Sequence, residues 1–365
     1  MILQHTGIGI DRILLSGISI GNDQLLSACN LFGFIRDVPA VGCSAVPEFM
    51  KNAGCSVWRG FSDRKLGQYV LSGTYIYNEG LHIFSVSCKR QGQQVARFQL
   101  CRTPANTCTV GYEVHPPHLR QGELQVFDQY ITSVIGEHFS YRSFATLGKV
   151  SCIEIYTDLL NVPPDSFLIH HPGSRKSANV GTQYSGSRKS PFQAKAYDKR
   201  TQLIDTNRPD PYSHHPYRTR LEITRRQTGL YLSQLADLEN QFEKIRLYDL
   251  DGAAMIKDKR FTWLMKSAQE KGLAVALSRY SKHQREDFRI LLDACQVDWY
   301  QSLLKLWSSY PKCLEVLQPQ YMLEMPTPQT TIQAPKEPLV SLEEIEASLN
   351  FFKAIAAMQE LGVAA

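Results

Sequence analysis

The residues best suited to chemistry lie between positions 182 and 226. This segment reads TQYSGSRKSPFQAKAYDKR and, after a polar connection, YRTRLEITRR. A Gly–Ser turn carries Arg188 and Lys189. Tyr197 follows between two lysines, and Glu222 lies between arginines further on. A tyrosine, a carboxylate and several cations on neighbouring strands can cut a phosphodiester and hold the cut end covalently. The segment therefore indicates DNA-strand nicking as the leading hypothesis.

Tyr197 is the candidate nucleophile. If QAKAYDK is a strand, alternation places Gln193, Lys195 and Tyr197 on one face and two small alanines on the other. The pKa of a free tyrosine is about 10, so its phenolate is scarce at neutral pH. Neighbouring cations such as Lys195, Lys199 and Arg200 are expected to favour the phenolate and the charged transition state.

Candidate metal ligands come from two further strands. In RTRLEITRR, alternation places Arg218, Arg220 and Glu222 on one face. The upstream strand SCIEIYTDL adds Glu154 and Asp158. Carboxylates on adjacent strands suit Mg²⁺ or Mn²⁺, although a glutamate between arginines is also typical of a salt bridge. Because strand residues four apart are separated by roughly 13 Å, we expect Glu154 and Glu222 as ligands and Asp158 as second choice.

Positive charge is concentrated around these residues. Residues 173–226 contain 12 Lys and Arg against 4 Asp and Glu, whereas the whole chain has a net charge of +5. Such a concentration indicates either a polyanionic partner or a solvated basic face. The predicted DNA contacts are Arg188, Lys189, Lys195, Lys199, Arg218 and Arg220.

The composition predicts a cytoplasmic protein without a membrane segment. No run approaches the roughly 18 apolar residues that a span needs, and the first residues lack the pattern of a secretory signal. The nine cysteines form neither a CxxC pair nor a Cys/His zinc spacing, so we expect reduced thiols. The absence of a Walker-type phosphate loop argues against an ATP-driven helicase.

The elements of the first half follow from apolar periodicity. We expect a helix at 23–33, strands at 67–77, 81–89 and 96–103, a helix at 122–138 and a strand at 148–159. The motif GSRKS occurs twice; its second copy (186–190) is predicted to be a turn that opens a strand. The strands at 193–199 and 218–226 are expected to pair in antiparallel fashion.

From residue 229 onward the apolar period becomes helical. One predicted helix covers the apolar positions 235–245 and ends near Leu250, and further helices are expected within 260–271 and 286–310. The tryptophans expected in the core are Trp263, Trp299 and Trp307. The histidine pairs at 170–171 and 214–215 are expected in loops, because both sit among Pro, Gly and Ser. They are not expected to form a paired-histidine metal site on a strand, since adjacent strand residues point to opposite faces.

These elements suggest five regions. They are a β-rich region (1–120), a nicking core (121–228), a helical DNA-recognition region (229–317), a proline-rich linker (318–340) and a C-terminal helix (341–365). The last helix begins with a capping box at Ser341. Its apolar face is expected to dock on the body of the protein or on a partner.

Taken together, YSGSRKS, AYDKR and YRTRLEITRR resemble the signature of rolling-circle replication initiators of the Rep_trans type, including related phage replication initiation factors. Those proteins have a Tyr-x-Gly-Ser-Arg-x-Ser turn, an arginine-containing strand ending in Tyr-Asn/Asp-Lys, and a downstream strand with Trp-Arg-hydrophobic-Glu. An acidic strand lies upstream, CIEIYTD here. The order and spacing agree across residues 150–226. The chain departs from the pattern at Lys195, where arginine is usual. It also departs at Tyr217, because the aromatic residue expected directly before the final Arg-Leu-Glu is displaced to this position.

The resemblance implies an α+β fold, in which an antiparallel β-sheet nicking domain with flanking helices precedes a helical C-terminal region. By position, it implies that Tyr197 is the nucleophile. It also implies that Glu154 and Glu222 bind Mg²⁺ or Mn²⁺, and that Arg188 and Lys199 contact phosphate.

The activity implied by the resemblance is initiation of plasmid or phage rolling-circle replication. One strand is nicked at the origin through a 5′-phosphotyrosine and later rejoined by transesterification. The implied partners are origin DNA, a host helicase and polymerase, and a second copy of the chain, with no membrane. The alternatives are a non-catalytic DNA-binding copy-control protein and a degenerate initiator that binds without cutting.

Overall fold

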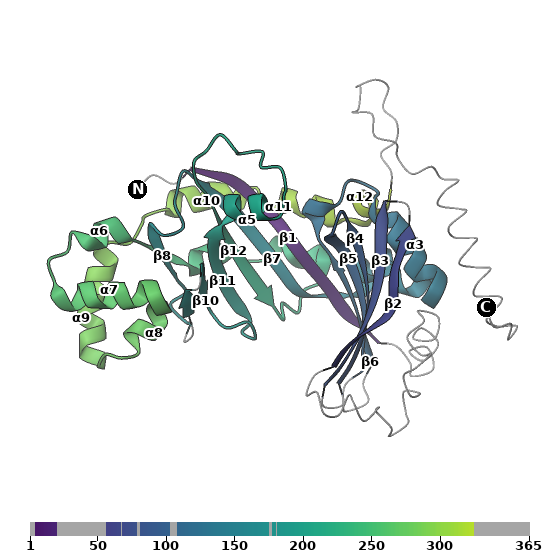
Figure 1. Cartoon of the computed structure of the whole chain (residues 1–365), viewed down its shortest axis with the longest axis horizontal. Coiled ribbons are helices and arrows are strands. Elements are labelled where there is room, and N and C mark those ends of the chain that lie inside the picture. Colours follow the sequence, from purple (N-terminus) through teal and green to yellow (C-terminus); the bar gives the residue numbers. More distant parts are fainter. Residues whose placement is uncertain are drawn as a thin grey trace, which may run out of the picture. The chain divides into compact units, whose positions relative to one another are not determined.

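The computed structural model shows a mixed α and β protein (Figure 1). It describes residues 4–19, 56–66, 68–78, 81–102, 108–174, 177–179 and 181–324. Contacts divide the chain into two compact units made of separated segments. The first unit comprises Met1–Asp11, Cys152–Thr228 and Gln234–Leu314, and the second comprises Arg12–Ser151, Gly229–Ser233 and Glu315–Ala365. Antiparallel strands and helices occur in both units, as expected of an α+β chain.

The second unit is built on an antiparallel sheet with the strand order β2-β3-β4-β5-β6-β1. The strands are β1 (Gln4–Ser19), β2 (Ser56–Leu66), β3 (Tyr69–Asn78), β4 (Leu81–Arg90), β5 (Gln93–Arg102) and β6 (Cys108–Val114). Gln91 and Gly92 join β4 to β5 with φ angles of 49° and 78°. Two successive positive φ values are typical of the tight turn that matches the twist of a hairpin. The predicted strands of this region are confirmed.

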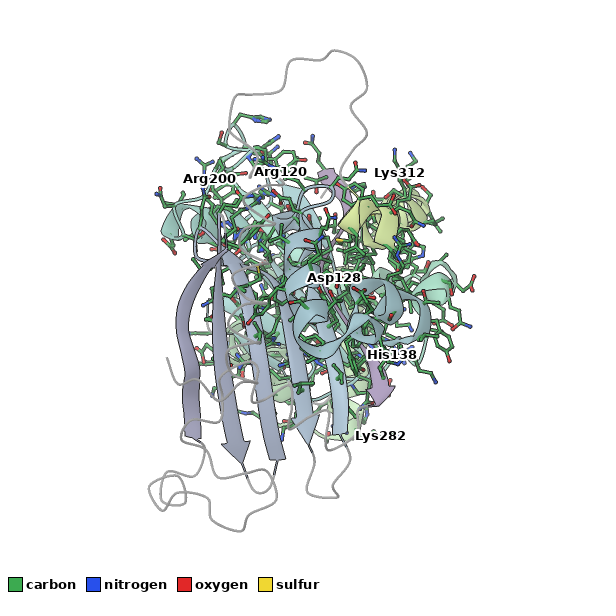
Figure 2. All side chains as sticks on the ribbon, turned by 90° about the vertical axis from the view of Figure 1, so that its right-hand side faces the viewer. Arg120, Asp128, His138, Arg200, Lys282 and Lys312 are labelled. Carbon is green, nitrogen blue, oxygen red and sulfur yellow. The ribbon has the colours of Figure 1, made fainter. Side chains whose placement is uncertain are left out.

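Helices complete the core of the second unit. They are α3 (Leu124–Ile135), α4 (Tyr141–Leu147) and α12 (Pro319–Leu323). Figure 2 shows α3, with Asp128 labelled, lying across the strands of this sheet. Asp128 accepts hydrogen bonds from the backbone N–H of Tyr141 at 2.6 Å and from the hydroxyl of Tyr112 at 3.1 Å. Burial raises the pKa of this carboxyl to about 6.

The first unit contains the strands predicted to carry the chemistry. The first part of β1 is followed in its sheet by β7, β12, β11, β10 and β9. These strands are β7 (Lys149–Leu160), β9 (Ser177–Asn179), β10 (Thr182–Ser185), β11 (Phe192–Asp198) and β12 (Arg218–Arg226). β12 pairs in antiparallel fashion with β11 on one side and with β7 on the other. The predicted pairing is therefore confirmed.

One face of this sheet is apolar. Ala194 and Ala196 of β11 and Ile223 of β12 are at most 1% exposed. Side chains alternate along a strand, so the residues between them point to the opposite, polar face. Each polar residue is thus held in place by buried neighbours on the same strand.

The rest of the first unit is mainly helical. A two-stranded sheet pairs β8 (Phe167–His170) with β13 (Arg246–Asp249). The helices are α5 (Lys199–Asp205), α6 (Leu250–Ala254), α7 (Lys259–Lys271), α8 (Leu273–Leu277), α9 (Lys282–Ala294), α10 (Tyr300–Ser308) and α11 (Tyr310–Cys313). A buried cluster that includes Phe261, Leu264 and Phe288 joins α6–α9 to the small sheet (Figure 1). The predicted helices within 260–271 and 286–310 are confirmed.

The helix predicted over 235–250 is wrong. Two short 3-10 helices, η3 (Leu232–Asp237) and η4 (Gln241–Lys244), replace it, and strand β13 follows them. The other 3-10 helices of the described residues are η1 (Pro116–His118), η2 (Glu137–Phe139) and η5 (Glu315–Leu317). The side chain of Asn240 accepts a hydrogen bond from the N–H of Phe242 at 3.1 Å and starts a new turn there. Leu235 and Phe242 are nevertheless buried. The apolar spacing thus indicated burial correctly, but not a continuous helix.

Two further expectations are corrected. Trp263 is 65% exposed on α7 rather than in the core, whereas Trp299 is buried as expected. His170 lies in β8 and is buried, not in a loop. The predicted helix at 23–33 and the C-terminal helix lie outside the described residues, and so does the linker beyond residue 324. Within the described ranges, no helix has the length and apolar character needed to cross a membrane.

Candidate carboxylate and tyrosine site

Three carboxylates converge on the polar face of the sheet in the first unit. They belong to Asp11 of β1, Glu154 of β7 and Glu222 of β12, and one oxygen of each lies within 4.8 Å of the others. Both glutamates are buried, and Asp11 is partly exposed. The two glutamates expected to act together therefore lie together. Asp11 was not predicted.

Strand register explains how the glutamates meet. In the β12–β7 ladder Glu222 lies opposite Tyr156, and Thr224 lies opposite Glu154. The two glutamates are thus diagonal neighbours on one face, a separation that long side chains can bridge. The Thr224 hydroxyl donates a hydrogen bond of 3.3 Å to Glu154 Oε1 and fixes that side chain.

Glu222 is the electrostatic centre of the cluster. It is 1% exposed and forms an ion pair with the ammonium of Lys195, its partner across the β11–β12 ladder. Burial raises the pKa of Glu222 to about 7; Lys195 opposes this rise, and the charges of Glu154 and Asp11 add to it. Three carboxylates this close repel one another unless a proton or cation neutralises them.

The donor set fits a hard divalent cation. Mg²⁺ and Mn²⁺ prefer carboxylate oxygen over nitrogen or sulfur. Asp11, Glu154 and Glu222 offer such oxygens from three different strands. These residues can hold the ion that the sequence led us to expect.

Tyr197 lies beside this cluster. Its hydroxyl donates a hydrogen bond of 3.4 Å to Glu222 Oε2. The ammonium groups of Lys195 and Lys199 lie 5.7 and 5.9 Å from the centre of its ring. The sequence predicted that these cations would favour the phenolate, but burial and the charge of Glu222 raise the pKa of Tyr197 well above its ordinary value. With its pKa raised in this way, Tyr197 is a neutral phenol near pH 7.

Lys199 is an unusual cation because it is 6% exposed at the start of α5. Its ammonium donates a hydrogen bond of 2.7 Å to Gln202 Oε1. Burial, together with the charge of Arg220, lowers the pKa of Lys199 to about 8. Lys199 therefore carries its charge at neutral pH and starts to lose it just above.

Asp158 does not join the carboxylate cluster. It accepts hydrogen bonds from Arg220 at 2.7 and 3.0 Å and from Arg218 at 2.9 Å, and all three side chains are buried. Burial would raise the pKa of Asp158, but these two arginines lower it. Both guanidinium groups are thus engaged by carboxylates and hold this side of the site; the predicted contact of Arg218 and Arg220 with DNA stays a prediction.

Arg220 also connects this buried network to the cluster. It donates a hydrogen bond of 3.2 Å to Asp11 Oδ1, and its guanidinium carbon lies 3.6 Å from the centre of the Tyr156 ring. The Tyr156 ring in turn occupies the space beside Gly9, where an added Cβ would come within 2.4 Å of it. A side chain at position 9 would push Tyr156 away, and this part of β1 therefore needs glycine.

Arg188 and Lys189 lie on the turn between β10 and β11. Both are exposed, and they are therefore free to meet a polyanion. Ser190 closes the turn by donating from its N–H and its hydroxyl to Ser187 O, at 3.1 and 2.9 Å. Gly186 has a φ of +101°, and an added Cβ would lie 2.6 Å from the carbonyl oxygen of Phe192. The predicted turn before a strand is confirmed.

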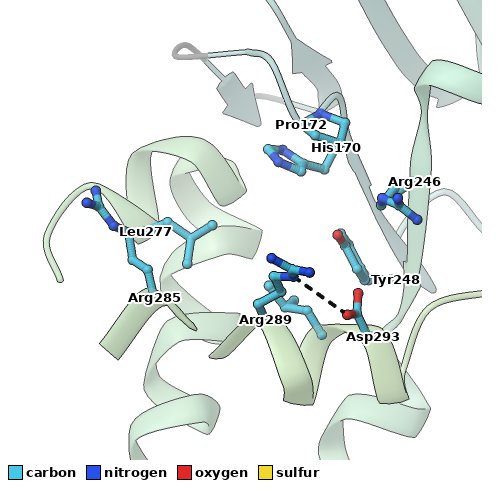
Figure 3. Close-up of a pocket in the computed structure, with 9 residues that line it drawn as sticks. His170, Pro172, Arg246, Tyr248, Leu277, Arg285, Arg289 and Asp293 are labelled. Carbon is cyan, nitrogen blue, oxygen red and sulfur yellow. Dashed lines mark ion pairs between the residues drawn. The ribbon is translucent and has the colours of Figure 1, made fainter. Parts of the chain in front are cut away.

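A separate cationic pocket of about 410 Å³ lies among β8, β13, α8 and α9 (Figure 3). It is lined by His170, Pro172, Arg246, Tyr248, Leu277, Arg285, Arg289, Leu292 and Asp293. Three arginines against one aspartate give this pocket a positive character. Burial, together with the charges of His171 and Arg246, lowers the pKa of His170 to about 4, so its imidazole is neutral near pH 7.

Comparison with known proteins adds no family to this description. No protein-family model matches the chain, and no curated protein sequence matches it. The functional argument therefore rests on the residues and their geometry.

Proposed function

We propose that the first unit is a metal-dependent DNA strand transferase that nicks one strand and can rejoin it. The observation that carries this proposal is the hydrogen bond of 3.4 Å between the hydroxyl of Tyr197 and Glu222, a member of the three-carboxylate cluster. A nucleophile, a base and a cation site are thus adjacent. The resemblance to Rep_trans-type initiators names the same tyrosine and two of the same carboxylates.

The proposed reaction is a transesterification. Oη of Tyr197 attacks a backbone phosphorus, the new O–P bond forms, and the bond from phosphorus to the 3′ oxygen breaks. The phenol proton passes to Oε2 of Glu222, and the leaving 3′ oxygen takes a proton from solvent. The products are a 5′-phosphotyrosine and a free 3′-OH. The reverse attack by a 3′-OH rejoins the strand without ATP, because the phosphodiester energy is kept in the tyrosyl ester.

The surrounding charges support this chemistry. A bound Mg²⁺ or Mn²⁺ supplies Lewis-acid polarisation of the phosphate and stabilises the phenolate. Lys195 keeps its charge because Glu222 and Glu154 raise its pKa against the opposing effect of burial. Lys195 and Lys199 therefore present two cations beside Tyr197, where negative charge develops during phosphoryl transfer.

The proposed substrate is DNA presented as a single strand or hairpin at the nick site. Arg188 and Lys189 extend the positive charge onto the exposed β10–β11 turn. The resemblance further suggests origin DNA of a plasmid or phage, a host helicase and polymerase, and a second copy of the chain as partners in the cytoplasm.

The test is a nicking assay on supercoiled DNA that carries the gene and its flanks, with Mg²⁺ or Mn²⁺. Open-circle product and protein covalently attached to the 5′ end are expected for wild type and absent for Tyr197→Phe. Tyr156→Phe is the matched control, because it removes another hydroxyl of the same sheet and keeps the ring that stacks on Arg220. Attachment that survives in Tyr197→Phe would refute the assignment. Tight binding without cleavage would instead support the non-catalytic or degenerate alternatives.

A further inference from the structure

Helix α7 presents a large aromatic side chain to solvent. Its buried side is formed by Phe261, Leu264, Met265 and Ala268, which are at most 6% exposed. Trp263 lies on the opposite side and is 65% exposed. The core of α6–α9 is thus complete without this tryptophan.

Cations surround Trp263 on the helix. Lys259 and Arg260 precede it by four and three residues, and Lys266 follows it by three, which are the spacings that bring side chains together on one face. All three are exposed, and the Lys266 ammonium lies 5.9 Å from the centre of the Trp263 ring. Arg260 forms an ion pair with Asp258 at 3.8 Å. We call Lys259, Arg260, Trp263 and Lys266 the α7 surface.

The composition of the α7 surface restricts what it can bind. Trp263 exposes a large flat apolar ring beside three exposed cations, a combination that suits a ligand carrying both rings and negative charge. An apolar protein partner would have to bury three cations with it, at a high desolvation cost. A polyanion with exposed aromatic rings matches both the indole of Trp263 and the cations around it. Its phosphates pair with the cations, and its rings stack on the indole.

We propose that the α7 surface binds single-stranded nucleic acid by stacking an unpaired base on Trp263. Lys259, Arg260 and Lys266 contact the phosphates on either side of that base. A duplex is a poorer ligand, since its base faces are already covered by stacking. This inference uses none of the residues of the carboxylate site, and it stands whether or not Tyr197 is a nucleophile.

The test measures binding of the full chain to fluorescently labelled oligo(dT) and to a duplex of equal length, by anisotropy in EDTA so that no cleavage occurs. Because stacking on one aromatic contributes about 1–3 kcal/mol, Trp263→Ala is expected to weaken oligo(dT) binding by about 5- to 150-fold. Trp263→Phe should retain most of the affinity. Ile290→Ala is the matched control, because Ile290 is a similarly exposed apolar residue (71%) on α9.

The cations are tested by salt dependence. Lys259→Gln and Lys266→Gln are each expected to reduce the slope of log affinity against log salt by about 0.7, the value for one single-strand phosphate contact. All substituted side chains are exposed, so thermal unfolding should match wild type.

Two results would overturn the inference. One is unchanged oligo(dT) affinity in Trp263→Ala. The other is an equal loss for single strand and duplex. A change in oligomeric mass on light scattering, without a change in oligo(dT) affinity, would instead make the α7 surface a protein interface.

Discussion

Glu222 is expected to destabilise the protein at neutral pH when no cation is bound. Its pKa rises from an ordinary 4.5 to about 7 in the folded chain. Between these values the folded protein holds a proton that the unfolded chain has released, so stability falls as pH rises through this window. The difference corresponds to about 3 kcal/mol once pH exceeds 7. Glu222→Gln, which resembles the protonated form, should therefore raise the free energy of unfolding by about 3 kcal/mol at pH 8.

The assay is urea unfolding of the full chain in EDTA at pH 5 and pH 8, with free energies from linear extrapolation. The gain in Glu222→Gln should fall below about 1 kcal/mol at pH 5, because this pH lies only about half a unit above the ordinary pKa of 4.5 that applies in the unfolded chain. Glu113→Gln is the control of opposite sign. Although burial would raise the pKa of Glu113, His115 and Arg97 hold it at about 2, so its substitution should destabilise the protein at pH 8.

Adding a divalent cation should reverse the order of the two proteins at pH 8. A ligand that binds only the folded state stabilises it by about 4.1 kcal/mol at 1,000 times its Kd, which exceeds the difference of about 3 kcal/mol between the two proteins. Wild type should gain this stability with Mg²⁺ or Mn²⁺, and Glu222→Gln should gain much less because it has lost a ligand. The reasoning would be refuted if Glu222→Gln were no more stable than wild type in EDTA at pH 8, or if its gain were equal at both pH values.

Three further predictions concern buried ionisable groups. Asp158→Asn should lower the free energy of unfolding by about 3–5 kcal/mol in urea, because Arg218 and Arg220 would remain buried without their anion; a loss under about 1 kcal/mol would contradict this. Burial raises the pKa of Asp128 to about 6, so this carboxyl makes wild-type stability fall as pH rises from about 4 to 6. Asp128→Asn should remove this part of the fall in urea unfolding measured across this range, and the part due to Glu222 should remain. The pKa of His170 is lowered to about 4, so its contribution to stability is lost as pH falls from about 6.5 to 4. An imidazole titration followed by NMR should show a midpoint near 4, and a midpoint near 6.5 would contradict the burial of the ring.

The sequence predicted the part of the site that depends on local pattern. Alternation along β7, β11 and β12 places Glu154, Tyr197 and Glu222 on one face, and the structure has these strands adjacent and antiparallel. Asp11 could not be found in this way. It comes from a strand 143 residues before Glu154, and no local spacing reports such a long-range pairing. An aspartate within the apolar run GIGIDRILL was its only signal.

Other differences arise where tertiary context overrides a local pattern. The cations beside Tyr197 predicted a lowered pKa, but burial and Glu222 have the larger effect and raise it. Sequence alone does not show that Asp158 lies opposite Arg220 in the ladder, so the pairing of Arg218 and Arg220 with this carboxylate was not predicted; their contact with DNA stays a prediction. Trp263 fitted an apolar helix pattern, although the core of α6–α9 is filled by other residues.

The position of Asp11 on β1 has a consequence for the order of events in folding. Its carboxylate reaches the cluster only after β1 has found its place beside β7, which closes a loop of more than 130 residues. Long-range strand pairing is slow compared with local hairpin formation. A chain in which β11, β12 and β7 have already paired therefore has two of the three carboxylates and a weaker hold on a cation. Under the proposed function, DNA cutting begins only when the first strand has docked, so that an incompletely folded chain does not break DNA.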